Sequence, residues 1–282
     1  YLPETKFLWS YEADSLITDF KISKDGNRIL IGCESGSVYL LNKKGVLIRS
    51  LKMPDRIVNV SIAPTGDYFS FFTLEGKLYF LSDNGKILWT NKIGNLGRGI
   101  GISENGRFLI TGIDKTIYYI DRNGEIFWDV NLSDFISSVN ITGDGHFVFA
   151  GTEKGSLYCY KDDGNLNWKK EIREKIINID SEENYICIET EKGKVYLFDL
   201  KGNEIKNFNS EEDINFDIFN SEILNLISGK KGSYLYFLSY DKKGLWKYLL
   251  RERISFLKST PDGKMVFSSE GKNLFTFSII WK

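Results

Sequence analysis

Seven repeats of a unit of about 40 residues, which in its complete form has four short apolar stretches, predict an all-β fold for this chain. Each repeat contains an aromatic residue next to a hydrophobic one, and these aromatic residues recur at spacings of 40, 39, 40, 38, 40 and 39 residues. They are Tyr39, Tyr79, Tyr118, Tyr158, Tyr196, Tyr236 and Phe275. Glycine turns separate the apolar stretches, which is the pattern of short antiparallel strands. Four strands per unit of this length are typical of a propeller blade. The sequence therefore predicts a seven-bladed β-propeller of four-stranded antiparallel blades.

The first unit shows the order of the elements within a blade. Alternating apolar and polar residues predict an innermost strand over Ile17–Ser23, and "KDGN" predicts the turn that ends it. The apolar run "RILIGC" predicts the second strand, and the turn "ESG" leads into a third strand that carries Tyr39. The turn "NKKG" precedes the outermost strand. In three later units this strand contains a tryptophan: Trp89, Trp128 and Trp168. No stretch has a convincing helical periodicity.

The two ends of the chain complement each other. Trp9 lies 80 residues, or two periods, before Trp89, and therefore occupies the outermost position of a blade. The seventh unit, Arg253–Lys282, contains only three strands. We expect Lys6–Tyr11 to complete this blade and close the ring, which leaves no open sheet edge. One domain, 1–282, is predicted, with blades at about 15–55, 56–95, 96–134, 135–174, 175–213, 214–252 and 253–282 plus 1–14.

The repeated tryptophans have two interpretations. Each indole could belong to an aromatic platform for a ligand, or it could pack against the next blade. An indole buries roughly 150–250 Å² when it packs in this way. We favour the packing interpretation. The tryptophan is absent from the corresponding place in units one, five and six, which suggests that the docking is optional from blade to blade.

Two phrases resemble those of a known superfamily. "DRNGEIFW" (Asp121–Trp128) resembles the tryptophan-docking repeat of PQQ-like (quinoprotein-like) propellers. "ISKDGNRILIGCESGSVYLLNKKG" (Ile22–Gly45) resembles the WD-repeat-like units of prokaryotic surface and envelope proteins. The resemblance covers essentially the whole chain and implies the propeller fold, without a particular activity. Quinoprotein dehydrogenases typically have eight blades, an adjacent cysteine pair and an acidic calcium site, which this sequence lacks, so no cofactor is expected.

Composition excludes several classes of function. The net charge is −1, so the chain as a whole does not attract nucleic acid or an anionic membrane, and no apolar stretch is long enough to cross a bilayer. Three cysteines in apolar strands, Cys33, Cys159 and Cys187, are expected to be buried free thiols. The one histidine, His146, lies in a variable turn, which excludes a Ser-His-Asp triad and histidine-metal hydrolases. We expect neither an enzyme nor a metal site.

The glycine-rich stretch "GNLGRGIG" (Gly94–Gly101) lies between strands and not before a helix. It therefore does not predict a phosphate-binding loop. We expect Gly99 and Gly101 to allow the innermost strand to come close to the axis, and the alternative is a role in lining the channel or contacting a ligand.

A non-catalytic scaffold is the predicted function. The connections between blades gather on one face around the channel mouth, and they carry charges of both signs that either are merely solvated or bind a protein or peptide. The candidate binding residues of this rim are Arg56, Arg98, Asp134, Lys175, Asp213, Arg251 and Arg253. The alternative is a carbohydrate- or small-ligand-binding propeller, or a vestigial quinoprotein-like enzyme, that uses the channel mouth. The resemblance implies an extracytoplasmic setting, with the cytoplasm as the alternative, and we expect a monomer.

Overall fold

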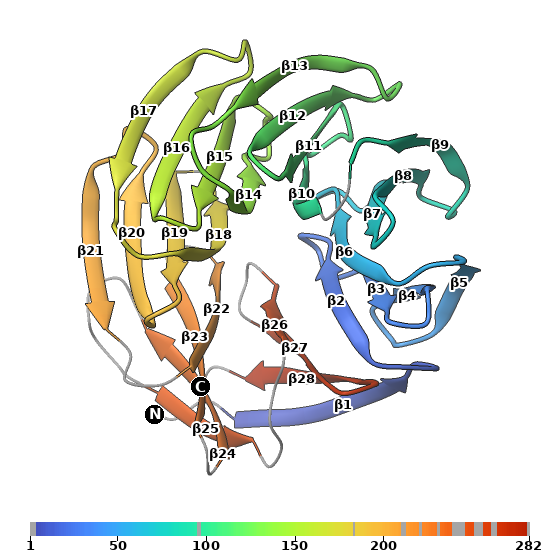
Figure 1. Cartoon of the computed structure of the whole chain (residues 1–282). Helices are drawn as coiled ribbons and strands as arrows, with labels where there is room; N and C mark the ends of the chain where they lie inside the picture. The colour runs from blue at the N-terminus through green and yellow to red at the C-terminus, as the bar shows by residue number, and fades with distance from the viewer. Residues whose placement is uncertain are drawn as a thin grey trace.

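The computed structural model describes the backbone of residues 4–94, 97–182, 184–209, 213–219, 222–229, 232–238, 246–250, 256–260 and 264–280. Side chains are described for the same residues except 4–5, 182, 208–209 and 213–250. Within these ranges, hydrogen bonds arrange 28 strands into seven antiparallel sheets of four strands each. The sheets follow one another around a central axis (Figure 1). The prediction of an all-β propeller is confirmed.

The strands of the first three sheets are ordered from the axis outward as they are in the sequence. The first sheet contains β2 (Ile17–Ile22), β3 (Arg28–Cys33), β4 (Ser37–Asn42) and β5 (Leu47–Lys52). The second contains β6 (Ile57–Ile62), β7 (Tyr68–Thr73), β8 (Lys77–Ser82) and β9 (Ile87–Lys92). The third contains β10 (Gly97–Ile102), β11 (Phe108–Ile113), β12 (Thr116–Asp121) and β13 (Ile126–Asn131).

The next three sheets repeat this order, and the last one joins the two ends of the chain. The fourth contains β14 (Ile136–Ile141), β15 (Phe147–Thr152), β16 (Ser156–Lys161) and β17 (Leu166–Glu171). The fifth contains β18 (Ile176–Glu182), β19 (Tyr185–Thr190), β20 (Lys194–Asp199) and β21 (Glu204–Asn209). The sixth contains β22 (Asp213–Phe219), β23 (Glu222–Gly229), β24 (Gly232–Leu238) and β25 (Trp246–Leu250). The last contains β26 (Phe256–Ser259), β27 (Met265–Glu270), β28 (Asn273–Ile280) and β1 (Glu4–Glu12).

The hydrophobic core consists of layers between neighbouring sheets. Leu30 and Leu40 of the first sheet, for example, pack against Ile57 and Phe71 of the second, and all four side chains are buried. Similar clusters join the second sheet to the third, the third to the fourth and the fourth to the fifth. Each fully buried side chain of this size contributes roughly 1.5–3 kcal/mol. Both faces of a blade are therefore apolar, and the polar groups are left to the turns and the central axis.

Four tryptophans of outermost strands have described side chains, and each of them docks on the next blade. The indole Nε1 donates a hydrogen bond to a backbone carbonyl in the turn between the third and fourth strands of that blade: Trp9 to Lys43 (2.9 Å), Trp89 to Arg122 (2.8 Å), Trp128 to Asp162 (2.8 Å) and Trp168 to Leu200 (2.9 Å). The ring covers the glycine of the same turn, which is Gly164 beneath Trp128 and has a positive φ of 80°. The predicted packing of the indoles between blades is confirmed.

A β-bulge precedes each docking position. The register between the third and fourth strands shifts by one residue in six of the sheets, counted over the described strands. The extra residues are Leu8, Ile48, Leu88, Phe127, Asn167 and Ile205. An inserted residue changes the side of the sheet to which the next side chain points. The bulge therefore directs the tryptophan toward the neighbouring blade.

The prediction of a seven-bladed propeller is corrected to six blades that share one construction. The sheet β22–β25 pairs in register throughout and has no bulge, and its side chains are outside the described residues. The physical reason lies in the sequence of this unit, because "NSEEDINFDIFNSEI" lacks the first glycine turn and "GLWKY" lacks the docking tryptophan. The six remaining sheets share the bulge, and their side-chain packing is described.

The predicted ring closure is corrected to a joint on one side of the last sheet. β1 pairs with β28 along Glu4–Glu12, and a buried cluster joins Phe267 and Leu274 of this sheet to Phe20 and Ile29 of the first blade. Trp9 adds its hydrogen bond to the same joint. On its other side the last sheet faces β22–β25, where no side-chain packing is described, so a ring closed on both sides is not shown (Figure 1).

Candidate functional site: the rim and the central cavity

The rim consists of the connections that lead into each innermost strand and of the turns between second and third strands. These segments meet at one end of the blades, because the Leu74 amide donates to the Arg56 carbonyl (2.9 Å) and the Glu153 amide to the Phe135 carbonyl (2.9 Å). Two predicted rim residues, Arg56 and Lys175, form ion pairs across neighbouring blades.

The distances of these pairs are 3.2 Å from Arg56 Nη1 to Glu34 Oε1 and 3.8 Å from Lys175 Nζ to Glu153 Oε1. All four side chains keep a third or more of their surface exposed. Such pairs contribute less than about 1 kcal/mol each. Their charges are therefore available to a partner at a small cost in stability.

Acidic residues of the rim hold turns within their own blades. Asp134 is buried, and its Oδ2 accepts a hydrogen bond from the Lys154 amide at 2.7 Å. Asp14 accepts from the hydroxyls of Ser37 (2.6 Å) and Ser35 (2.9 Å). Burial acts to raise the pKa of Asp14, but these hydroxyls and the Lys52 ammonium outweigh it and hold the pKa well below its usual range. The structure therefore places Asp134 in the framework of a turn.

The remaining predicted rim residues differ in how much is described. Arg98 is exposed and lies at the start of β10, where the rim meets the central cavity. Asp213 begins β22, but its side chain is not described. Arg251 and Arg253 lie outside the described residues.

Three large apolar side chains are exposed on the rim, and sequence reasoning missed them. Leu16 is 54% exposed, Leu74 44% and Phe135 48%. Lys115 Nζ lies 5.0 Å from the centre of the Phe135 ring, which places a cation beside it. The signal was present in the repeat, because Leu16 and Phe135 each lie 40 residues before a basic rim residue. Apolar and charged side chains thus share one repeat position.

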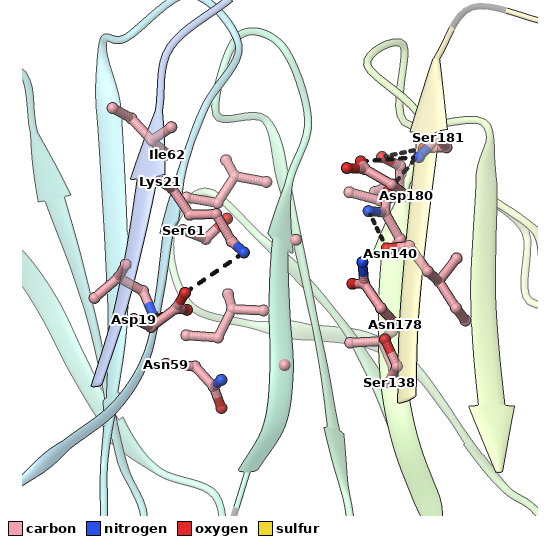
Figure 2. A pocket seen from close by; sticks show the side chains of 18 of the residues that line it. Asp19, Lys21, Asn59, Ser61, Ile62, Ser138, Asn140, Asn178, Asp180 and Ser181 are labelled. Carbon is pink, nitrogen blue, oxygen red and sulfur yellow. Dashed lines mark hydrogen bonds and ion pairs between the residues drawn. The ribbon is translucent and has the colours of Figure 1, made fainter. Parts of the chain in front are cut away.

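The innermost strands enclose a polar cavity of about 730 Å³ along the axis. Figure 2 shows two of its walls, with Asp19 and Asn59 on one side and Asn140 and Asp180 on the other. Lys258 Nζ lies 2.8 Å from Asp180 Oδ2, an ion pair whose side chains are about four-fifths buried. On the first wall Lys21 Nζ lies 3.6 Å from Asp19 Oδ1.

The glycines of β10 have a packing role at the cavity wall. A Cβ on Gly101 would lie 2.8 Å from Ile141 Cγ2 on β14, and a Cβ on Gly97 would lie 2.8 Å from the Phe72 ring. Because glycine has no side chain, β10 can approach the side chains of the neighbouring blades closely, and not only the axis. β10 does line the cavity, as the alternative interpretation of this stretch predicted.

Part of the chain is similar to a known protein family. Residues 114–212 match the family model described as outer membrane protein assembly factor BamB. The matched segment includes β12 to β21 and the docking residues Trp128 and Trp168. The matched part of this β-propeller is PQQ-like. No curated protein matches it.

The propeller keeps its thiols in the core. Cys33, Cys159 and Cys187 are free and buried, as predicted, and burial raises the pKa of Cys33 and of Cys159 to about 12. A thiol with such a pKa is protonated and unreactive at neutral pH.

The histidine of the chain is paired with a surface carboxylate. His146 Nδ1 lies 2.7 Å from Asp162 Oδ2 in the turns at the face opposite the rim, and both side chains are exposed. Within the described residues no group of three or more His, Cys, Asp or Glu is placed to hold a metal ion. Nor do these residues include a helix with the length and apolarity needed to span a bilayer.

Proposed function

We propose that this propeller is a non-catalytic scaffold that binds a protein or peptide partner on its rim. The observation that carries the proposal is the exposure of Leu16, Leu74 and Phe135 among ion-paired charges. Exposed apolar side chains surrounded by polar ones are typical of protein interaction sites. Loops held by a rigid scaffold are also the usual place for binding residues.

The charges of the rim would select and orient the partner. Arg56 and Lys175 lie beside the acidic partners Glu34 and Glu153, so the rim offers separated charges of both signs at fixed places. Such a pattern favours a partner with complementary charges and disfavours others. The description of the matching family, an outer membrane protein assembly factor, supports an extracytoplasmic setting at the envelope and a protein partner.

Site-specific cross-linking tests the proposal. A photoreactive amino acid is placed at Phe135 or Leu74 on the rim, or at Phe127, which is 69% exposed on an outermost strand and serves as the control. We expect one discrete cross-linked protein from the two rim positions and none from the control. Changing Arg56 and Lys175 to Glu should remove this product and lower the melting temperature by only a few degrees, because each ion pair contributes less than about 1 kcal/mol. Equal cross-linking from all three positions, or none from the rim, would contradict the proposal.

A further inference from the structure

The polar side chains of the central cavity fall into two groups. The first group is satisfied within the protein: it includes the Lys258–Asp180 and Lys21–Asp19 ion pairs, and Asn140, whose Oδ1 accepts from the Ser181 hydroxyl at 2.8 Å. The second group has no hydrogen bond or ion pair from its side chains to any described residue, and consists of Asn59, Ser61, Arg98, Ser138 and Asn178.

These unpartnered side chains lie on four consecutive innermost strands. Asn59, Ser138 and Asn178 each occupy the third position of their strand, in β6, β14 and β18. They therefore lie at one level of the cavity, and Figure 2 shows Asn59 on one wall with Ser138 and Asn178 on the other. Arg98 is the second residue of β10 and so lies nearer the mouth. Ile177, which is 43% exposed, occupies the second position of β18 at the same height.

The chemistry of this group fits a peptide segment. An asparagine amide donates and accepts at once, as a peptide group does, so the two can form paired hydrogen bonds. A guanidinium binds a carboxylate through two parallel hydrogen bonds. Of the described residues that line the cavity, only Phe20 and Phe256 are aromatic, and Phe20 is buried in the wall. The described part of the cavity lining therefore offers little of the aromatic surface that small-molecule pockets usually have.

The dimensions are suitable as well. The innermost strands are mostly six residues long, or about 20 Å, so an extended segment of about six residues would run along them. The volume of about 730 Å³ lies within the range of binding cavities, which is roughly 300–1,000 Å³.

We propose that the cavity receives an extended peptide segment of the partner, with an acidic side chain against Arg98 and peptide groups against Asn59, Ser138 and Asn178. This inference rests on the proposed function, because the segment belongs to the protein that docks on the rim. The segment enters from the rim, where Arg98 meets its carboxylate first, and the exposed Ile177 contacts an apolar side chain next to it.

A displayed library of random heptapeptides is the probe for this site. It is selected against the wild-type propeller, the Arg98→Glu variant and the Arg107→Glu variant. Arg107 lies over the Phe108 ring, does not line the cavity and makes a matched control for the change of charge. We expect Asp or Glu to be enriched at one position with the wild type and with Arg107→Glu, and the enrichment to disappear with Arg98→Glu.

A peptide from this selection is then synthesised with a fluorescent label, and its affinity is measured by anisotropy. Arg98→Glu should weaken binding at least tenfold, while Asn178→Ala and Ser138→Ala should each weaken it about fivefold, as expected for one lost hydrogen bond. Melting temperatures show that each variant is folded. No enriched peptide, enrichment without an acidic residue, or equal affinity for Arg98→Glu would overturn the inference.

The two proposals can fail separately. If the rim cross-links a partner but the library yields no acidic peptide, the peptide site is wrong and the rim function stands. If an acidic peptide binds at Arg98 but Phe135 and Leu74 give no cross-link, the cavity site stands and the docking of a protein on the rim is wrong.

Discussion

Replacing Trp128 tests whether indole docking holds neighbouring blades together. Trp128→Phe keeps an aromatic ring over Tyr119, whose ring centre lies 4.9 Å from the indole, but removes the hydrogen bond from Nε1 to the Asp162 carbonyl. The lost bond should lower the free energy of unfolding by about 1 kcal/mol. Trp128→Ala also removes the stacking and the packing of a half-buried ring, for a total of about 3 kcal/mol.

Thermal unfolding followed by circular dichroism measures both effects. In a domain of this size, 1 kcal/mol corresponds to about 2–4 °C in melting temperature. We therefore expect Trp128→Phe to melt about 2–4 °C below the wild type, and Trp128→Ala about 6–12 °C below it. A change of less than 1 °C in Trp128→Ala would show that the docked indole does not stabilise the fold.

A double-mutant cycle with Gly164 isolates the contact itself. A Cβ at Gly164 would lie 3.1 Å from Trp128 Cγ, and the positive φ of 80° adds strain that does not depend on the indole. Gly164→Ala should therefore cost more in the wild type than in the Trp128→Ala variant, by at least about 0.5 kcal/mol. Equal costs in the two backgrounds would refute the contact between the indole and the turn.

Four further predictions follow from the same structure. Arg49 takes the docking position of the first blade and contacts Gly85, so Arg49→Trp should raise the melting temperature by about 2–4 °C, and no increase would contradict this. Gly101→Ala should lower the stability in urea by about 1–3 kcal/mol through its clash with Ile141, whereas the control Gly143→Ala, whose nearest neighbour is 3.8 Å away, should not. Because the folded protein lowers the pKa of Asp14, the ionised carboxylate stabilises the fold at pH values above its unfolded pKa of about 3.9, and this stabilisation is lost as the pH falls below that value. Asp14→Asn should therefore lower the free energy of unfolding by at most about 1 kcal/mol at pH 7 and by progressively less between about pH 4 and pH 2. Cys33 and Cys159 should react with a thiol reagent at pH 8 only as fast as the blades open, and rapid labelling of the native protein would show that they are accessible.

The repeat made most of the fold predictable. Turn glycines recur at a fixed distance, and the fold needs them there: Gly36 has a φ of 84°, and a Cβ on it would lie 2.4 Å from the Met53 carbonyl oxygen. The position of Trp9, two periods before Trp89, located the strand that pairs with β28. These features could be predicted from the sequence because the backbone geometry of a blade requires them in every repeat.

Other features depend on contacts between residues whose spacing in the sequence does not follow the repeat. The bulge at Phe127 appears in the sequence only as one more apolar residue, since its extra residue is defined by the register of the facing strand. The hydrogen bond that Asp134 accepts from the Lys154 amide could not be predicted either, because the two residues are 20 positions apart in the sequence. The sixth unit lacks the first glycine turn and the docking tryptophan. The sequence therefore did not predict that its strands pair without the β-bulge that the other six sheets have.

The rim position shared by Leu16, Arg56, Phe135 and Lys175 separates what the fold requires from what it permits. The backbone carbonyl of each of these four residues accepts the same hydrogen bond from the turn of its own blade, so the position is equivalent in all four. Its side chains are nevertheless aliphatic, basic, aromatic and basic in turn, and they remain in contact with solvent. The framework fixes the backbone at this position but not the identity of the side chain. Binding of a partner can therefore determine which residue is found there. Under the proposed function, the order of these four side chains around the axis describes the surface that a partner would match: apolar patches that alternate with acidic groups placed against Arg56 and Lys175.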